Sequence, residues 1–199
     1  MLRFISAAVL LTLAHGSVFA ASSLCATGEQ TTTVKALYAT ATVPPTFMAA
    51  AKLGLPEALV ASAIAGEQAI GTTGAGFEAV WNSLQNWADA TVVLLKSGYV
   101  FEVRGRIPDG APSTKSQFYN LKQDGAGLGG HLRPDLVAAI YAVDLVGAQG
   151  PLRGVTFLDA AGEGIFGVYL PEGAAPKPAL VAQFEKTRAV IVGLPRVCS

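Results

Sequence analysis

Histidine and cysteine are scarce in this chain of 199 residues, which contains two of each. A conventional zinc site takes three or four ligands from cysteine, histidine and carboxylate side chains, and the pattern that would supply them is absent. The acidic residues form no D-x-D-x-D-G motif, so a calcium-binding loop is also excluded. The chemistry left open is that of a site with one or two ligands.

Charge is also sparse, with 14 lysine and arginine residues against 14 aspartate and glutamate residues. No basic run is present, whereas nucleic-acid binding depends on clustered cations. No G-x-S-x-G pattern presents a nucleophilic serine. The loose G-x-G-x-x-G match at 125–130 lacks the amphipathic helix and acidic residue of a dinucleotide site. The sequence therefore offers no support for a nucleic-acid binder, a serine hydrolase or a dinucleotide enzyme.

The first 20 residues have the pattern of a secretory signal peptide. Arg3 precedes an apolar run over 4–14, and Val18-Phe19-Ala20 forms the cleavage motif. We expect cleavage after Ala20 and export to the periplasm or beyond, with a retained N-terminal anchor as the alternative. Cleavage would remove His15 and leave His131 as the only imidazole of the mature protein.

The two cysteines, Cys25 and Cys198, lie near opposite ends of the predicted mature chain. In an oxidising compartment the simplest prediction is one disulfide between them. Such a long loop would contribute about 4–5 kcal/mol in the chain-entropy model. Two free or intermolecular thiols are the alternative.

Hydrophobic periodicity predicts an α+β protein. We expect an extended lead-in over 21–45 with at most a short helix at 34–38, and then one domain over 46–199 with a large, mainly antiparallel sheet. The run 136–145 fits a strand or a helix equally well. The predicted helices are 46–54, 56–66, 77–87 and 178–191; the predicted strands are 91–96, 99–105, 117–122, 151–160 and 163–171; 107–112 and 124–130 are predicted loops.

The segment GLGGHLRPD, at 127–135, places His131 behind three glycines. Haem needs one or two axial ligands such as histidine or tyrosine, apolar walls, and cations for its propionates. Tyr119 precedes His131 on a predicted strand, and Arg133, Arg104 and Arg106 are near in sequence. The plain alternative is that His131 is a loop residue that hydrogen-bonds a turn.

Five motifs together resemble the haem utilisation carrier proteins of the ChuX and HutX type. They are YVFEVRGRIP, QFYNL, GLGGHLRPD, GVTFLDAAGEGIFGVYLP and ALVAQFEKTRAV, and the likeness covers about 47–190. The resemblance implies a domain similar to one half of the HemS and ChuS proteins, usually homodimeric. It also implies that haem is bound as cargo and transferred to or from a partner protein, without catalysis.

The resemblance also implies site residues. His131 matches the histidine of the family's G-H-[IL]-R motif, and Tyr119 matches the aromatic residue before its N-L, so both are candidate iron ligands. From their charge and their place in the sequence, rather than from the resemblance, Arg133 and Arg104 are candidate contacts of the haem propionates. The chain departs from the family in its export signal and at Gly167, which replaces a cation of the M-F-K motif.

These features leave three hypotheses. The first is an exported haem carrier that binds haem through His131, with Tyr119 as second or alternative ligand. The second is a module that has kept the fold and binds another ligand or a protein. The third is a haem-degrading protein.

Overall fold

A computed structural model describes residues 24–66, 68–85, 87–96, 99–122, 127–171 and 177–198. The predicted signal peptide at 1–20 lies outside these residues, as do 124–126 of the predicted glycine-rich loop. The predicted class, α+β with a large antiparallel sheet, short N-terminal helices and a C-terminal helix, is confirmed.

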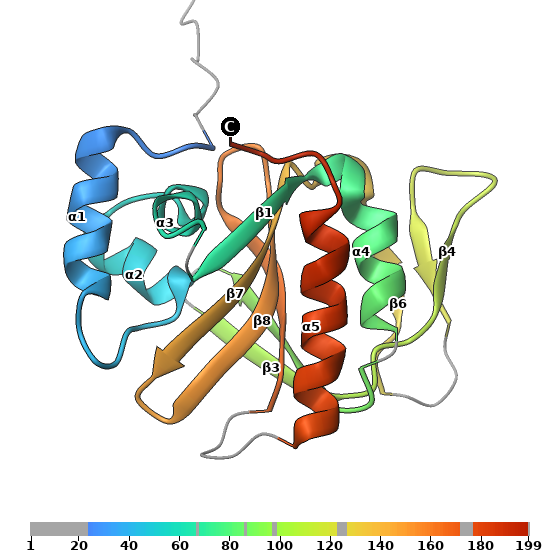
Figure 1. The fold of residues 1–199 in the computed structure, drawn as a ribbon. Helices are drawn as coiled ribbons and strands as arrows, with labels where there is room; N and C mark the ends of the chain where they lie inside the picture. The colour runs from blue at the N-terminus through green and yellow to red at the C-terminus, as the bar shows by residue number, and fades with distance from the viewer. Residues whose placement is uncertain are drawn as a thin grey trace, which may run out of the picture.

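The main sheet has six strands, all paired antiparallel, in the order β1-β7-β8-β9-β2-β3. It curves through the middle of the molecule (Figure 1). The undecided run at 136–145 contributes to β7, where apolar residues are buried on both faces. The strands are β1 (Ala69–Thr73), β7 (Ala139–Gly147), β8 (Gly150–Leu158), β9 (Gly164–Tyr169), β2 (Ala90–Lys96) and β3 (Tyr99–Gly105).

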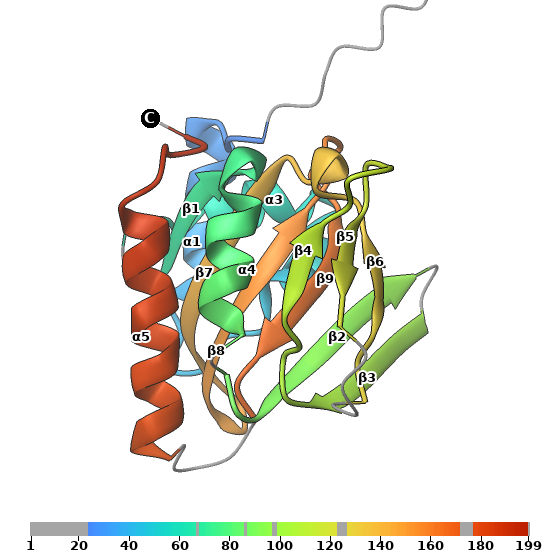
Figure 2. The same cartoon turned by 90° about the vertical axis from the view of Figure 1, so that its right-hand side faces the viewer.

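A second, three-stranded sheet lies beside the main one (Figure 2). It consists of β4 (Gly110–Pro112), β5 (Tyr119–Leu121) and β6 (Gly130–Leu132). The predicted loops at 107–112 and 124–130 were therefore wrong at β4 and β6. Proline is tolerated in β4 because β4 is an edge strand and Pro112 is its last residue, so no ladder hydrogen bond from its nitrogen is needed.

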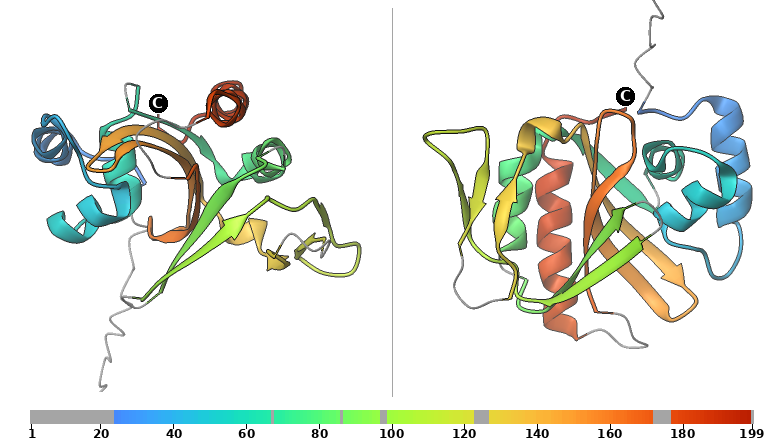
Figure 3. Two further views of the ribbon diagram at one scale, coloured as in Figure 1. Left: turned by 90° about the horizontal axis from the view of Figure 1, so that it is seen from below. Right: turned by 180° about the vertical axis from the view of Figure 1, so that it is seen from behind.

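The five α-helices of the described residues cover the two faces of the main sheet, as Figure 3 shows. Three short helices, α1 (Gly28–Tyr38), α2 (Thr46–Leu53) and α3 (Glu57–Ala63), lie on one face. Two others, α4 (Phe77–Leu84) and α5 (Pro178–Val192), lie on the opposite face. Two 3₁₀ turns, η1 (Gly74–Gly76) and η2 (Pro134–Leu136), precede α4 and β7.

Helix α1 is longer than the short helix predicted within the extended lead-in. It begins after Thr27, whose hydroxyl accepts a hydrogen bond from the Gln30 amide at 3.3 Å, while the Gln30 side chain accepts one from the Thr27 amide at 2.9 Å. This capping box satisfies two amides that a helix start leaves free. Its T-x-x-Q signature is local, but the threonine-rich composition obscured it.

Each face of the main sheet packs on its own core. The aromatic core, on the side of α4 and α5, is rich in large rings: Phe77, Trp81, Trp87, Tyr119, Phe157, Phe166 and Phe184. The alanine core, under α1–α3, is rich in small side chains: Ala49, Ala50, Ala58, Ala61, Ala63, Ala69 and Ala139. Strand β7 supplies both, because successive side chains of a strand point to opposite faces.

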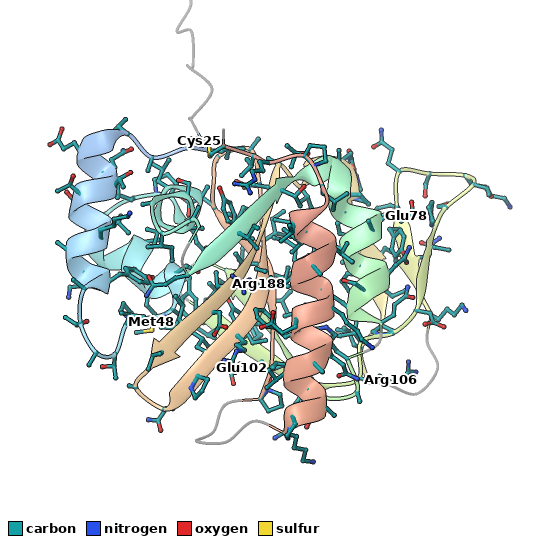
Figure 4. All side chains as sticks on the ribbon, in the orientation of Figure 1. Cys25, Met48, Glu78, Glu102, Arg106 and Arg188 are labelled. Atoms are coloured by element: carbon teal, nitrogen blue, oxygen red, sulfur yellow. A yellow bond between two sulfur atoms is a disulfide. The ribbon has the colours of Figure 1, made fainter. Side chains whose placement is uncertain are left out.

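The predicted disulfide joins Cys25 and Cys198, whose Cα atoms are 5.8 Å apart. Cys25 lies beside the C-terminal segment in space (Figure 4). The bond therefore holds the segment before α1 against the segment that follows α5.

Candidate functional site

The two candidate iron ligands lie on neighbouring strands of the small sheet but on opposite faces. Tyr119 pairs with Leu132 across β5 and β6, whereas His131 pairs with Asn120. Since paired residues share a face and neighbours in a strand alternate, His131 and Tyr119 point in opposite directions. The structure therefore does not bring them together around one iron.

Tyr119 points into the aromatic core and is only 1% exposed. Its ring contacts Phe77, with centroids 5.5 Å apart, and Trp81 at 6.3 Å. Its hydroxyl donates to the Gly110 carbonyl oxygen at 2.9 Å. Burial, together with nearby carboxylates, raises the pKa of Tyr119 above its usual value, which disfavours the phenolate that binds iron.

His131 is exposed on the outer face of the small sheet. Its Nδ1 atom lies 2.7 Å from Oδ1 of Asn120, and its ring packs near Phe118, with centroids 5.7 Å apart. The Nε2 atom takes part in no hydrogen bond of the described residues. His131 is thus a β6 residue with an available ring nitrogen, not a residue that bonds a turn.

Arg133 follows β6 and lies close to His131 in the chain. Its guanidinium donates two hydrogen bonds to Asp135, at 2.6 and 2.7 Å, and lies 5.8 Å from the centroid of Phe118. The hydrogen bonds from Arg133 hold the pKa of the Asp135 carboxyl below its usual value. The pair is partly exposed, so its net contribution to stability is small.

A groove of about 610 Å³ opens between the small sheet and the β9 and β2 strands of the main sheet. This volume is within the range of small-molecule sites, roughly 300–1,000 Å³. His131 and Arg133 line it, and its walls are mainly apolar: Phe77, Leu94, Leu132, Leu136, Ile165 and Phe166. Asp135 and Asp159 also line the groove. Apolar walls with an imidazole and a guanidinium fit the requirements of haem.

Arg104 is not part of this groove. On β2, Val92 packs in the aromatic core, whereas Val93 packs in the alanine core. Arg104 pairs with Thr91, so it shares the face of Val93. It donates two hydrogen bonds to Asp89, at 2.7 and 2.9 Å, and lines a separate cavity of about 410 Å³. The structure therefore separates Arg104 from His131.

Strand β3 carries Tyr99, Phe101 and Val103 on the face of the hairpin that Leu94 shares. These residues are exposed, Phe101 to 58%, and Phe101 pairs with Leu94 of the groove wall. The alternating pattern of the predicted hairpin places these three side chains on one face, as observed. That this face is left uncovered by the rest of the described chain depends on the tertiary structure.

Sequence reasoning missed three contacts of the site: Phe118, Asn120 and Asp135. All three lie inside the quoted motifs QFYNL and GLGGHLRPD. The cross-strand pairing of β5 and β6 determines that Asn120 faces His131. Asp135 alone carried a local signal, its position two residues after Arg133.

Within the described residues, no group of three or more histidine, cysteine, aspartate or glutamate side chains is arranged to hold a metal ion. Among the helices of the same residues, none has the length and apolar character needed to cross a bilayer.

Comparison with known proteins gives consistent matches. The family described as haem utilisation ChuX/HutX matches residues 71–187, more than half of the chain. The chain is 28% identical over 131 residues to a protein of Vibrio cholerae serotype O1 named intracellular heme transport protein HutX. That match covers 63% of this chain and 66% of the relative, just under two thirds of its length.

Several solved structures share the fold. The crystal structure of ChuX has a TM-score of 0.71 at 15% identity, over 80% of this chain and 98% of that one. A structure of the heme degrading enzyme ChuS of Escherichia coli O157:H7 has a TM-score of 0.63 at 16% identity, over 78% of this chain and 47% of that one. The predicted likeness to one half of such a protein is confirmed for the fold.

Proposed function

Because the chain belongs to the haem utilisation ChuX/HutX family, we propose that it binds haem reversibly and carries it as cargo. The observation that carries this proposal is His131 at the edge of the apolar groove, with Nε2 available. A haem-related role follows from the family. Binding through His131, export and the homodimer go beyond what membership of the family implies, and we propose each of them here.

The residues of the groove suit the parts of the ligand. A histidine nitrogen is an axial ligand of haem iron, and apolar walls exclude water from the macrocycle. Leu132, Ile165 and Phe166 provide such walls, and Arg133 supplies a cation that a propionate could share with Asp135. One protein ligand on an open groove suits release as well as binding.

His131 rather than Tyr119 is the proposed axial ligand. For Tyr119 to bind iron, its hydroxyl would have to leave the Gly110 carbonyl and its ring would have to leave the aromatic core. Burying a ring of this size contributes about 1.5–3 kcal/mol, so the rearrangement is unfavourable. Tyr119 instead anchors the small sheet, because its ring packs in the aromatic core and its hydroxyl bonds Gly110 of β4.

A haemin titration followed by absorbance tests the proposal. The wild-type protein should give a Soret shift that saturates, and His131→Ala should abolish it or weaken binding strongly. Tyr119→Phe is the matched control and should bind like the wild type. If haemin gives no saturable shift, or if the His131→Ala variant binds as tightly as the wild type, the proposal is wrong.

Export is proposed from the signal-peptide pattern at 1–20, and the disulfide between Cys25 and Cys198 agrees with an oxidising compartment. N-terminal sequencing of the protein from a periplasmic fraction should begin at residue 21. A full-length N-terminus in the cytosolic fraction would contradict export.

A homodimer is proposed from β3, which is the last strand of its sheet. An edge strand with exposed apolar residues is a template for pairing with another chain, and Tyr99, Val100 and Phe101 are each more than half exposed. Light scattering after size exclusion should give twice the chain mass. Phe101→Lys should shift it to the monomer mass, and a monomeric wild type would contradict the proposal.

A second candidate is a module that binds a protein or a ligand other than haem. The feature in its favour is Gly167, at the position where the resemblance to the M-F-K motif implies a cation. Capture of a partner from periplasmic extract without haem, together with a flat haemin titration, would favour it. Haem degradation is distinguished by ascorbate, which should leave the Soret band of a carrier unchanged but bleach that of a degrading enzyme.

A further inference from the structure

We propose that Asn120 is the positioning residue of the haem site: its carboxamide oxygen selects the His131 tautomer whose Nε2 lone pair is free to bind iron. This inference rests on the proposed function, since it names what makes His131 a ligand. It concerns a residue whose side-chain oxygen lies beside His131 Nδ1, and the haem-free protein is sufficient to test it.

The pairing of β5 with β6 creates the contact. Asn120 and His131 are directly opposite each other, so their side chains lie side by side on the outer face of the small sheet. Oδ1 of Asn120 is 2.7 Å from Nδ1 of His131. A carboxamide oxygen only accepts hydrogen bonds, so the hydrogen must be on Nδ1.

The tautomer matters because neutral imidazole carries one hydrogen, on either nitrogen. With the hydrogen on Nδ1, the lone pair is on Nε2, the nitrogen farther from the backbone. An exposed histidine without Asn120 would divide between both tautomers and several rotamers. Part of the population would then present an N–H to the groove in place of a ligand.

The His131 ring has a second neighbour. Phe118 packs near it at 5.7 Å, and the Arg133 guanidinium lies 5.8 Å from the Phe118 ring. Arg133 is itself held by Asp135 at 2.6 Å. This series of contacts limits the rotation of the imidazole, while Asn120 determines which nitrogen is the donor. Metal-binding histidines commonly have such a partner, and its loss weakens affinity about 10–100-fold.

The first experiment uses ¹⁵N NMR of the haem-free protein at a pH where His131 is neutral. His131→Ala identifies the His131 signals, because the full chain has two histidines. The wild type should show a protonated Nδ1, Asn120→Ala should show a mixture of tautomers, and Asn120→Asp, which keeps the acceptor, should retain the wild-type pattern. A wild type with Nε2 protonated, or an unchanged Asn120→Ala spectrum, would overturn the inference.

The second experiment repeats the haemin titration with the same variants. Asn120→Ala should bind haemin 10–100-fold more weakly, whereas Asn120→Asp should bind within a few-fold of the wild type. Gln117→Ala, an exposed change near β5, is the control and should have no effect.

The two failures can be told apart. If the wild type binds no haemin, the proposed function fails, and NMR still decides the role of Asn120. If the wild type binds haemin and Asn120→Ala binds equally tightly, only the inference about Asn120 fails. Far-ultraviolet circular dichroism checks that each variant is folded.

Discussion

The two faces of the main sheet bury different kinds of side chain, and only one face carries the groove. Under α1–α3 the core is rich in alanine, which allows short helices to pack closely on the sheet. On the opposite face, under α4 and α5, the core is rich in large rings. The groove borders this aromatic core, since Phe77 and Phe166 belong to the core and also line the groove.

The two cores also bury different kinds of polar group. In the aromatic core, both indoles are satisfied: Trp81 Nε1 donates to the Pro108 carbonyl oxygen at 3.3 Å and Trp87 Nε1 donates to Thr187 Oγ1 at 3.0 Å. The alanine side instead buries a carboxyl group, Glu57, which accepts from Thr46 at 2.6 Å and from Thr156 at 3.2 Å. The contribution of the alanine core, under α1–α3, is therefore the one that should depend on pH.

The largest effect should come from the disulfide, which holds the segment before α1, on the side of the alanine core. Replacing Cys25 and Cys198 by serine removes a cross-link between residues 173 apart in sequence. The chain-entropy model predicts a loss of about 5 kcal/mol in the free energy of unfolding. Urea unfolding of the oxidised wild type and the double variant measures it. Equal midpoints would show that the bond does not constrain the unfolded chain.

On the aromatic face, Trp81→Ala should cost about 3–5 kcal/mol, because it leaves a cavity among Phe77, Phe157 and Phe166. The counterpart in the alanine core is Ala61→Val, where added methyl groups overfill the core at a cost of about 1–3 kcal/mol. The free energies of unfolding of the two variants give the contrast. If Ala61→Val lowers the free energy of unfolding more than Trp81→Ala does, the sizes of the buried side chains do not explain how the two cores differ.

Glu57→Gln tests whether the stability that the alanine side contributes depends on pH. Burial raises the pKa of Glu57, a trend that the nearby charge of Glu163 reinforces, while hydrogen bonds from Thr46 and Thr156 oppose it. A raised pKa in the folded state means that the stability from neutral Glu57 is fully present below the unfolded pKa. It is lost as pH rises through the folded pKa.

The stability of Glu57→Gln relative to the wild type should therefore increase from acid to neutral pH. Urea unfolding of both proteins at pH 5 and pH 8 measures this difference. The other ionisable groups that influence or face this carboxyl are Tyr38, Tyr169 and Glu163, and they remain in both proteins. A difference that does not vary with pH would mean that Glu57 keeps an ordinary pKa.

The smallest effect is expected for Tyr119→Phe. The variant keeps the ring in the aromatic core and loses the hydrogen bond to the Gly110 carbonyl, so stability should fall by about 1 kcal/mol. Haemin affinity should not change, because the phenol does not face the groove. A tenfold loss of affinity would show that the two faces of the small sheet act together on haem.

Much of the fold was predictable from local patterns. The hairpin of β2 and β3, strands β8 and β9, and helix α5 follow from periodicity and turn residues. Strands β1, β4 and β6 were not predicted, because runs of three to five residues that each include a glycine carry little periodic signal. These strands form because a partner strand is present, as β5 is for β4 and β6.

The candidate site was predictable in part. His131 and Arg133 could be named from one motif, and both line the groove. Tyr119 and Arg104 could be named with equal reason, yet one is buried in the aromatic core and the other lies on the far face of the hairpin. Spacing along the chain does not reveal the face on which a residue lies until the register of the strands is known.

Sequence by itself determined the class of the fold, the cysteine pair and the single histidine of GLGGHLRPD, because composition and periodicity are properties of the chain. Tertiary structure decided which residues meet. The register of β5 and β6 placed Asn120 beside His131 and turned Tyr119 away from it. The reason is physical: side chains alternate across a strand, so a shift of one residue in pairing would exchange the ligand with the core residue.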